Sequence, residues 1–376
     1  MEKHGRPLNA LLISAIVWSG ISVACIALEP DAEMPQFRLP GLDGRLHDST
    51  EFEKSNILAV IFLSNHCPTS QMFQERLIRL AKDYRPHGFT TVAISPNDPE
   101  AILPDELAHS DLGDTIEEMG IRAKELSYPF HYLYDGKTQE AAKAFGARVT
   151  PHAFLFDKTR KLCYTGRVGD PKNPTRADRE NLRLAIEALV QDKTPPVVQG
   201  RAFGSSIKWS KNRAIVEKVR ERFSRETVSL KKADKRTLEF IRDNKATRPK
   251  LIYVWSIEDK RKRNDLLELS SIHKIYRKRG LEWVTVCIDG ETFQESVQQL
   301  LKETQASGRN FICPGSELSP LADLRAEKGN RITPYLALVE PRGKIAYRST
   351  AGLEPHLLKR HILAALLPGA DSTPSP

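Results

Sequence analysis

The chain has 376 residues, enough for about two domains, and its hydrophobic fraction of 40% is sufficient for ordinary globular cores. Its five cysteines are Cys25, Cys67, Cys163, Cys287 and Cys313. Their spacings exclude a paired zinc motif and a dense disulfide framework, and an odd count leaves at least one free thiol in an exported protein. The histidines are scattered without ligand spacing, so we predict no metal and no cofactor.

The net charge of +9 is unevenly distributed along the chain. Residues 201–280 contain 24 Lys and Arg against 10 Asp and Glu, which gives a local net charge of +14. Such a segment can attract anionic lipids or nucleic acid. Aromatic residues and recognition motifs are sparse there, which favours a solvated helical linker, and nucleic acid is not an expected partner.

Residues 1–28 are typical of an export segment. Lys3 and Arg6 form a basic start, and no further charge follows within the segment. Small residues suit cleavage after Ala27, whereas an apolar run of about 20 residues also suits an uncleaved membrane anchor. Lipid attachment at Cys25 is a third alternative. Each of them predicts an exported protein, periplasmic or membrane-anchored and facing outside the cytoplasm, so membrane association is an expected property.

The most informative stretch is Asn-His-Cys-Pro-Thr-Ser-Gln at residues 65–71. Before it, residues 57–63 form an apolar, β-branched run that predicts a buried strand. After it, residues 72–84 repeat apolar positions at helical spacing. Cys67 is therefore predicted on the turn that opens a helix, where unpaired N–H groups and the helix dipole lower the pKa of a thiol.

The chain continues with alternating strands and helices as far as residue 191. Strands are expected at 90–95, 128–135, 153–156 and 161–166, and helices at 113–126, 138–145 and 176–191. An insert precedes the first of these helices, and Asp114 or Thr115 is its expected cap. Thr150 and Pro151 stand just before the third of these strands.

The stretch FRLPGLDGRLHDSTEFEKSNILAVIFLSNHCP resembles the opening of redoxin domains, the alkyl-hydroperoxide-reductase and thiol-specific-antioxidant branch of the thioredoxin superfamily. The resemblance implies that Cys67 is the first cysteine of a Cys-x-x-Cys turn whose second position is Ser70. It also implies that Thr150-Pro151 carries a cis peptide bond beside Cys67, with backbone that can pair with an extended substrate.

The resemblance suggests chemistry through one cysteine, because Ser70 cannot resolve a mixed disulfide. A one-cysteine peroxidase needs a thiolate, a hydroxyl donor and a cation. Ser64 matches the Thr or Ser of the peroxiredoxin Thr-x-x-Cys motif, and Arg148 is the candidate cation. Val60, however, stands where peroxiredoxins carry proline.

Around these groups, four residues are the candidates for substrate binding. These are Thr150, Pro151, His66 and Pro68. His66 either polarises the thiolate or lies on a surface turn, and both interpretations are open. Further along, Gly-Arg-Ala-Phe-Gly-Ser-Ser-Ile-Lys-Trp at residues 200–209 resembles a redoxin-like tail that often reads Gly-Cys-Ser-Ile-Lys. Ser205 replaces that cysteine, so its help to Cys67 is expected to be absent.

From Lys250 onward the pattern of the first half returns. Trp255 precedes a turn in which Ser256 and Asp259 stand at the places of both cysteines of Trp-Cys-x-x-Cys, and Thr333-Pro334 repeats the Thr-Pro pair. We interpret this half as a redox-inactive thioredoxin-like domain that docks a substrate or a protein partner.

We therefore predict an α/β protein with two tandem thioredoxin-like domains, each a central mixed β-sheet flanked by helices. The expected parts are a signal or anchor at 1–28, a redoxin domain at 35–195, a basic helical linker at 196–245, a degenerate domain at 246–368 and a disordered tail at 369–376. The expected function is an exported thiol oxidoreductase, peroxidase-like or forming mixed disulfides through Cys67, with an external thiol reductant and a peroxide or disulfide substrate. The alternative is a non-catalytic module that binds partners through its cis-proline surfaces.

Overall fold

The structure is a computed structural model that describes residues 28–170, 172, 181–325, 333–350 and 352–367. The expected export segment, apart from Leu28, and the expected tail at 369–376 lie outside these ranges. Within them, no helix combines the length and the apolar character that a membrane span requires.

The first half of the chain forms a five-stranded mixed sheet with the order β5-β4-β3-β7-β8. Its strands are β3 (Ile57–Phe62), β4 (Phe89–Ser95), β5 (His131–Tyr134), β7 (His152–Phe156) and β8 (Leu162–Gly166). The helices of this half are α1 (Pro68–Asp83), α2 (Pro104–Leu107), α3 (Ile116–Glu125), α4 (Glu140–Ala144) and α5 (Asn181–Val190). A short hairpin of β1 (Arg38–Pro40) and β2 (Leu46–Asp48) precedes them.

The central strand β3 is buried along its whole length because helices cover both faces of the sheet. Alternate side chains of a strand point to opposite faces. Val60 accordingly packs in one apolar cluster with Ala142 and Phe145, from α4 and its end. Ala59 packs in the other cluster with residues of α1, α3 and α5.

The second half forms a six-stranded mixed sheet with the order β10-β13-β12-β11-β14-β15. Its strands are β10 (Leu230–Lys232), β11 (Lys250–Trp255), β12 (Glu282–Cys287), β13 (Arg309–Ile312), β14 (Tyr335–Val339) and β15 (Ile345–Ser349). Its helices are α7 (Lys235–Asp243), α8 (Lys262–Tyr276), α9 (Gln294–Glu303) and α10 (Pro355–Leu366). As β3 does with β4 and β7, β11 pairs parallel with β12 and antiparallel with β14.

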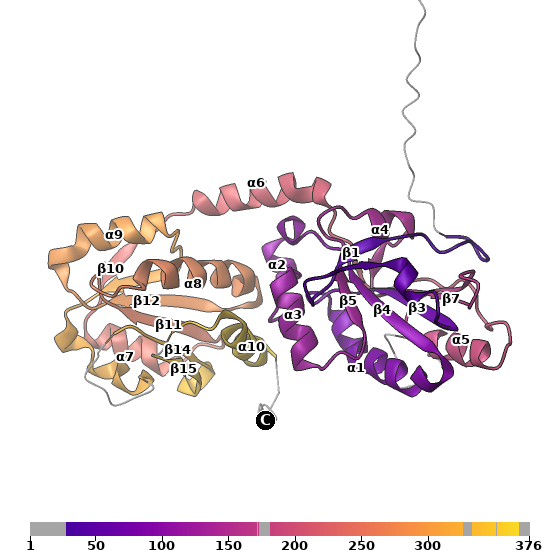
Figure 1. Cartoon of the computed structure of the whole chain (residues 1–376). Helices are drawn as coiled ribbons and strands as arrows, with labels where there is room; N and C mark the ends of the chain where they lie inside the picture. The colour runs from indigo at the N-terminus through magenta and orange to yellow at the C-terminus, as the bar shows by residue number, and fades with distance from the viewer. Residues whose placement is uncertain (1–27, 171, 173–180, 326–332, 351, 368–376) are drawn as a thin grey trace, which may run out of the picture.

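The structure differs from the helical linker expected over residues 196–245. Only α6 (Arg213–Ser224) spans the gap between the two sheets, along one side of the molecule (Figure 1). Beyond it, β10 pairs with β13 at the edge of the second sheet. Leu238 and Ile241 of α7 are fully buried in the core of that half. The sequence did not reveal the buried face of α7, because this face is short and charged residues surround its two apolar positions.

The two halves meet at a seam, which we define as the contact of residues 104–111 with α8, α10 and the turn after α8. Ala108 is buried within the apolar cluster of the second half. The Tyr276 hydroxyl donates to the Ser110 carbonyl over 2.6 Å. Arg360 of α10 makes ion pairs of 2.7 Å with Asp111 and 2.9 Å with Glu125. The insert that the sequence left unassigned thus belongs partly to the core of the other half (Figure 1).

Candidate active site

Cys67 lies at the N-cap of α1, at the end of the turn that follows β3. Its side chain is 0% exposed. The sulfur accepts a hydrogen bond from the Ser70 N–H at 3.4 Å and lies 2.8 Å from the Thr150 carbonyl oxygen. The Thr150-Pro151 peptide bond is cis. The structure therefore brings Cys67, Thr150 and Pro151 together, although they are far apart in the sequence.

Hydrogen-bond donors around the Cys67 sulfur favour its thiolate form. Burial raises the pKa of the thiol, but the Ser205 hydroxyl and N–H, followed by the N–H and hydroxyl of Ser70, lower it by more. The net result is a pKa below the ordinary value. Ser205 reaches the sulfur because β9 (Ser205–Ser206) pairs antiparallel with β6 (Val149–Thr150).

A buried ion pair lies next to the thiol. The His66 Nδ1 atom is 2.6 Å from the Asp114 carboxylate, and both side chains are at most 2% exposed. Burial lowers the pKa of His66, but the charge and the hydrogen bond of Asp114 raise it by more, and the nearby Cys67 thiolate adds to this. These interactions therefore favour the charged form of the imidazole beside the sulfur.

Asp114 owes its charged form to the donors that surround it. Burial raises the pKa of this carboxyl, but the charge and hydrogen bond of His66 lower it by more. Asp114 also accepts from the Asn65 N–H at 2.6 Å and from the Asn97 amide at 2.7 Å. Among the described residues, the His66 Nε2 atom is buried and has no hydrogen-bond partner. This nitrogen is therefore a buried polar atom that the site leaves unsatisfied.

The raised pKa of His66 predicts a specific pH dependence of stability. A group whose pKa is higher in the folded state stabilises the fold fully below its unfolded pKa, and this contribution is lost as the pH rises through the folded value. The stability difference between the wild-type chain and His66→Gln is therefore expected to be largest below pH 6.5, the ordinary histidine value, and to shrink at higher pH. Urea unfolding at several pH values measures it. The exposed His87, changed to Gln, serves as the control, and a difference that grows with pH would contradict the assignment.

Three other predicted residues, Ser64, Arg148 and Pro68, form no hydrogen bond with the Cys67 sulfur within the described part of the chain. The Ser64 hydroxyl pairs with the Thr150 hydroxyl at 2.8 Å, so its hydrogen-bond partner is Thr150 and not Cys67. The Arg148 side chain is exposed, and no contact between it and Cys67 is found in the described part of the chain. Pro68 is exposed and occupies the first turn of α1, where a missing N–H costs nothing.

Two residues of the site, Asp114 and Ser205, were not identified as such from the sequence. Asp114 was a candidate cap of α3, but Thr115 takes that position by accepting from the Glu118 N–H at 3.2 Å. The expected loss of assistance at position 205 is corrected, because the Ser205 hydroxyl lowers the pKa of Cys67. The sequence did contain a signal for Asp114. Two residues, Asp114 and Thr115, could each cap the start of α3, and only one of them is needed there.

The corresponding turn of the second half carries no thiol. The Ser256 hydroxyl donates to Asp289 at 2.8 Å, and the Ser256 N–H donates to Asp259 at 2.7 Å. Burial raises the pKa of Cys287 on β12 well above its ordinary value. The polar groups of this turn therefore satisfy one another, and the nearest sulfur is not activated.

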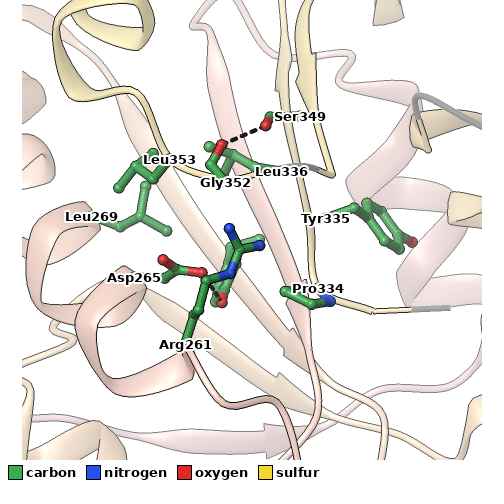
Figure 2. Close-up of a pocket in the computed structure, with 10 residues that line it drawn as sticks. Arg261, Asp265, Leu269, Pro334, Tyr335, Leu336, Ser349, Gly352 and Leu353 are labelled. Carbon is green, nitrogen blue, oxygen red and sulfur yellow. Dashed lines mark hydrogen bonds between the residues drawn. The ribbon is translucent and has the colours of Figure 1, made fainter. Parts of the chain in front are cut away.

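A cavity lies beside the other cis proline, Pro334. Figure 2 shows Arg261 and Asp265 facing this cavity from the start of α8. It measures about 10 Å³, about the space that one water molecule needs. The cavity is therefore a gap in the packing that is too small for a substrate. Within the described ranges, no three His, Cys, Asp or Glu residues are placed to hold a metal ion.

Residues 29–183 match the family model named Redoxin. A hypothetical protein from Sinorhizobium meliloti 1021 is 34% identical over 49% of this chain and 97% of its own, with a TM-score of 0.43. An uncharacterized conserved protein from Geobacillus kaustophilus is 37% identical over 48% of this chain and 93% of its own, with a TM-score of 0.43. A thiol-disulfide oxidoreductase from Bacteroides fragilis is 20% identical over 36% of this chain and 89% of its own, with a TM-score of 0.30. No curated protein matches the chain significantly. The mixed sheet, the flanking helices and the match over the Cys67 turn agree: residues 29–183 form a Redoxin domain with an α/β thioredoxin-like fold.

Proposed function

We propose that the protein is an exported thiol oxidoreductase that acts through the single cysteine Cys67. The observation that carries this proposal is the environment of the sulfur, which accepts a hydrogen bond from the Ser70 N–H at 3.4 Å and whose pKa is lowered by Ser205 and Ser70. Next to it, Asp114 keeps His66 charged. Perturbed groups gathered around one nucleophile are typical of functional sites. Export, to the periplasm or to a membrane anchor facing outside, rests on the composition of residues 1–28.

Two reactions suit a lone thiolate. With a peroxide, the sulfur attacks one oxygen, the O–O bond breaks, and Cys67 becomes a sulfenic acid while the leaving oxygen takes up a proton. With a disulfide, the sulfur attacks one partner sulfur, the S–S bond breaks, and a mixed disulfide forms as the other thiolate leaves. In both cases a substrate must supply the oxidising equivalent.

Restoring the thiolate then requires an external thiol. Cys163 is the other cysteine described in the first half, and it lies on β8 with its thiol against the Lys161 carbonyl at 3.5 Å. Burial raises the pKa of Cys163 to about 11, which leaves little thiolate for attack on an oxidised Cys67. The proposed reductant is thus a small thiol or a second protein.

The second candidate function is a binding module without turnover. The full burial of the Cys67 sulfur favours it, since a thiol that no reagent reaches has only a structural role. In that case, the edge beside the cis proline engages a partner, and the second half, which carries no thiol at its turn, contributes a further surface. The two functions differ in one measurable respect, the oxidation of Cys67.

We expect the wild-type chain, treated with hydrogen peroxide, to be labelled by a sulfenic-acid probe at Cys67. Cys67→Ser is expected to lose the label and all peroxide or disulfide turnover above background, because no other described thiol has a lowered pKa. Cys163→Ser is the matched control and should behave as the wild type. Labelling is read by mass spectrometry and turnover by the consumption of peroxide. Equal background rates in all three proteins would contradict the oxidoreductase and leave the binding module as the remaining candidate function.

A further inference from the structure

Residues 201–206 cross the mouth of the site as a strap anchored at both ends. Before it, the Gly200 N–H donates to the Thr165 carbonyl at 2.8 Å. After it, the Ile207 N–H donates to the Arg148 carbonyl at 3.1 Å, and the Ile207 side chain is buried in the first core. Between these anchors the strap is held mainly by the two-residue pairing of β9 with β6.

The strap closes the site. In the antiparallel register, Ser205 lies opposite Thr150 and Ser206 opposite Val149. Ser205 thus lies beside the Cys67 site and lowers the pKa of that thiol, and Cys67 is 0% exposed. A reagent in solution therefore reaches the sulfur only when the strap moves. Phe203, in the middle of the strap, is 53% exposed, so few buried contacts oppose that movement.

The residue type at position 205 indicates which kind of ligand the strap replaces. A serine differs from a cysteine only by oxygen in place of sulfur. Ser205 lies opposite Thr150, whose carbonyl oxygen is 2.8 Å from the Cys67 sulfur, so its hydroxyl lies close to where a second sulfur would stand for disulfide exchange. The backbone around Ser205 is extended and paired with a strand edge, which is how added peptide strands are recognised. The strap has the form of a bound cysteine peptide that cannot react.

We propose that residues 201–206 occupy a docking edge at Val149–Thr150, and that an extended polypeptide with a disulfide-bonded cysteine in register with Ser205 opens the site by replacing them. The proposal rests on the proposed function, since Cys67 is the reacting group. The Cys67 thiolate attacks the sulfur that takes the place of the Ser205 hydroxyl. The S–S bond of the polypeptide breaks, its other sulfur leaves as a thiolate, and a mixed disulfide with Cys67 forms.

A glycine in the strap offers a sharp test of closure. Gly204 has φ +157°, and a Cβ there would lie 1.9 Å from the Thr150 carbonyl oxygen, so Gly204→Ala must displace the strap. Gly200→Ala is the matched control, because its Cβ would meet nothing closer than 3.7 Å. Alkylation of Cys67 by iodoacetamide is measured from low to high pH. The plateau rate at high pH reports access to the thiolate, separately from the pKa.

The plateau rate of Gly204→Ala is expected to exceed that of the wild type by about tenfold or more, since a strap that is open for about a tenth of the time reduces the apparent rate by that factor. Gly200→Ala should match the wild type. An unchanged plateau rate in a folded Gly204→Ala protein would contradict the proposal that the strap closes the site. Should Gly204→Ala fail to fold, Ser205→Cys treated with excess oxidised glutathione takes its place. The glutathione disulfide is reduced to two thiols as an internal disulfide with Cys67 forms, which is the expected result, whereas two thiols that stay free or carry glutathione would contradict the strap.

The partner is tested with a synthetic probe. A peptide with the sequence of residues 200–207, with cysteine replacing the serine at 205 and activated as a thionitrobenzoate disulfide, is expected to react with Cys67 about tenfold faster than its scrambled form, which corresponds to about 1.4 kcal/mol of specific contacts. Equal rates for the two peptides would contradict the recognition of a polypeptide in register with Ser205 and would indicate a small-molecule substrate. Faster alkylation of Gly204→Ala without any sulfenic acid or mixed disulfide would support the strap and contradict the oxidoreductase.

Discussion

We expect Asp114→Asn to react with iodoacetamide at pH 7 about tenfold more slowly than the wild-type chain, because each unit of rise in a thiol pKa removes about nine-tenths of the thiolate below that pKa. Asp114 is the group that keeps His66 charged against the effect of burial. Without the carboxylate, burial lowers the pKa of His66, and the imidazole becomes neutral at pH 7. The Cys67 thiolate then loses a neighbouring positive charge.

The same substitution is expected to reduce the free energy of unfolding by about 3–5 kcal/mol, the usual effect of removing one partner of a buried ion pair. The new amide would also direct an N–H₂ group at donors that now point to the carboxylate, among them the Asn97 amide. Alkylation rates against pH give the thiol pKa, and urea unfolding gives the stability. Glu117→Gln, an exposed carboxylate three residues away, is the control. A Cys67 pKa that stays unchanged in Asp114→Asn would show that the ion pair has no influence on the thiol.

The second large effect is expected at the seam. Ala108→Asp places a carboxylate within the apolar cluster of the second half, and burying an unpaired charge costs several kcal/mol. We expect the two halves to separate, because exposing the new charge to water is less costly than keeping it buried. The separation should also reach Cys67, since the Ser110 hydroxyl donates to the Asn65 carbonyl at 3.1 Å in the turn before it.

Solution scattering measures the separation as an increase in the radius of gyration, and the alkylation profile measures the change in the Cys67 thiol. His109→Asp adds the same charge at the neighbouring exposed position and should change neither. Tyr276→Phe removes only the hydrogen bond to Ser110 and is expected to cost about 1 kcal/mol without separation. An Ala108→Asp protein as compact as the wild type would contradict the importance of the seam.

The strand, turn and helix around Cys67 were predictable because each depends on local pattern. The apolar run that becomes β3 and the helical spacing that becomes α1 are continuous in the sequence. The Thr150-Pro151 pair was recognisable from two residues. The return of the pattern in the second half was visible for the same reason, since its central strand β11 is also one continuous apolar run after Lys250.

The partners of the thiol were not predictable, since they arrive through distant pairings. Asp114 meets His66 from 48 residues away, and its sequence neighbours suggested only a helix cap. Ser205 reaches Cys67 through a two-residue strand, which is too short to show any alternation. The seam was invisible for a related reason, because Ala108 follows a single helical turn and completes a core built by residues more than a hundred positions later.

The burial of Ile207 has a practical consequence for anyone who cuts this chain into fragments. Ile207 packs among Phe37, Phe62 and Phe145, yet it lies 24 positions beyond residue 183, where the family match stops. A fragment that ends at residue 183 would lack three features of the intact chain. These are the buried Ile207 side chain, the Ser205 hydroxyl and the packing of the second half over Ala108. Such a truncated protein would be a poor guide to the intact molecule, whereas one that extends past Trp209 keeps the first two of these features.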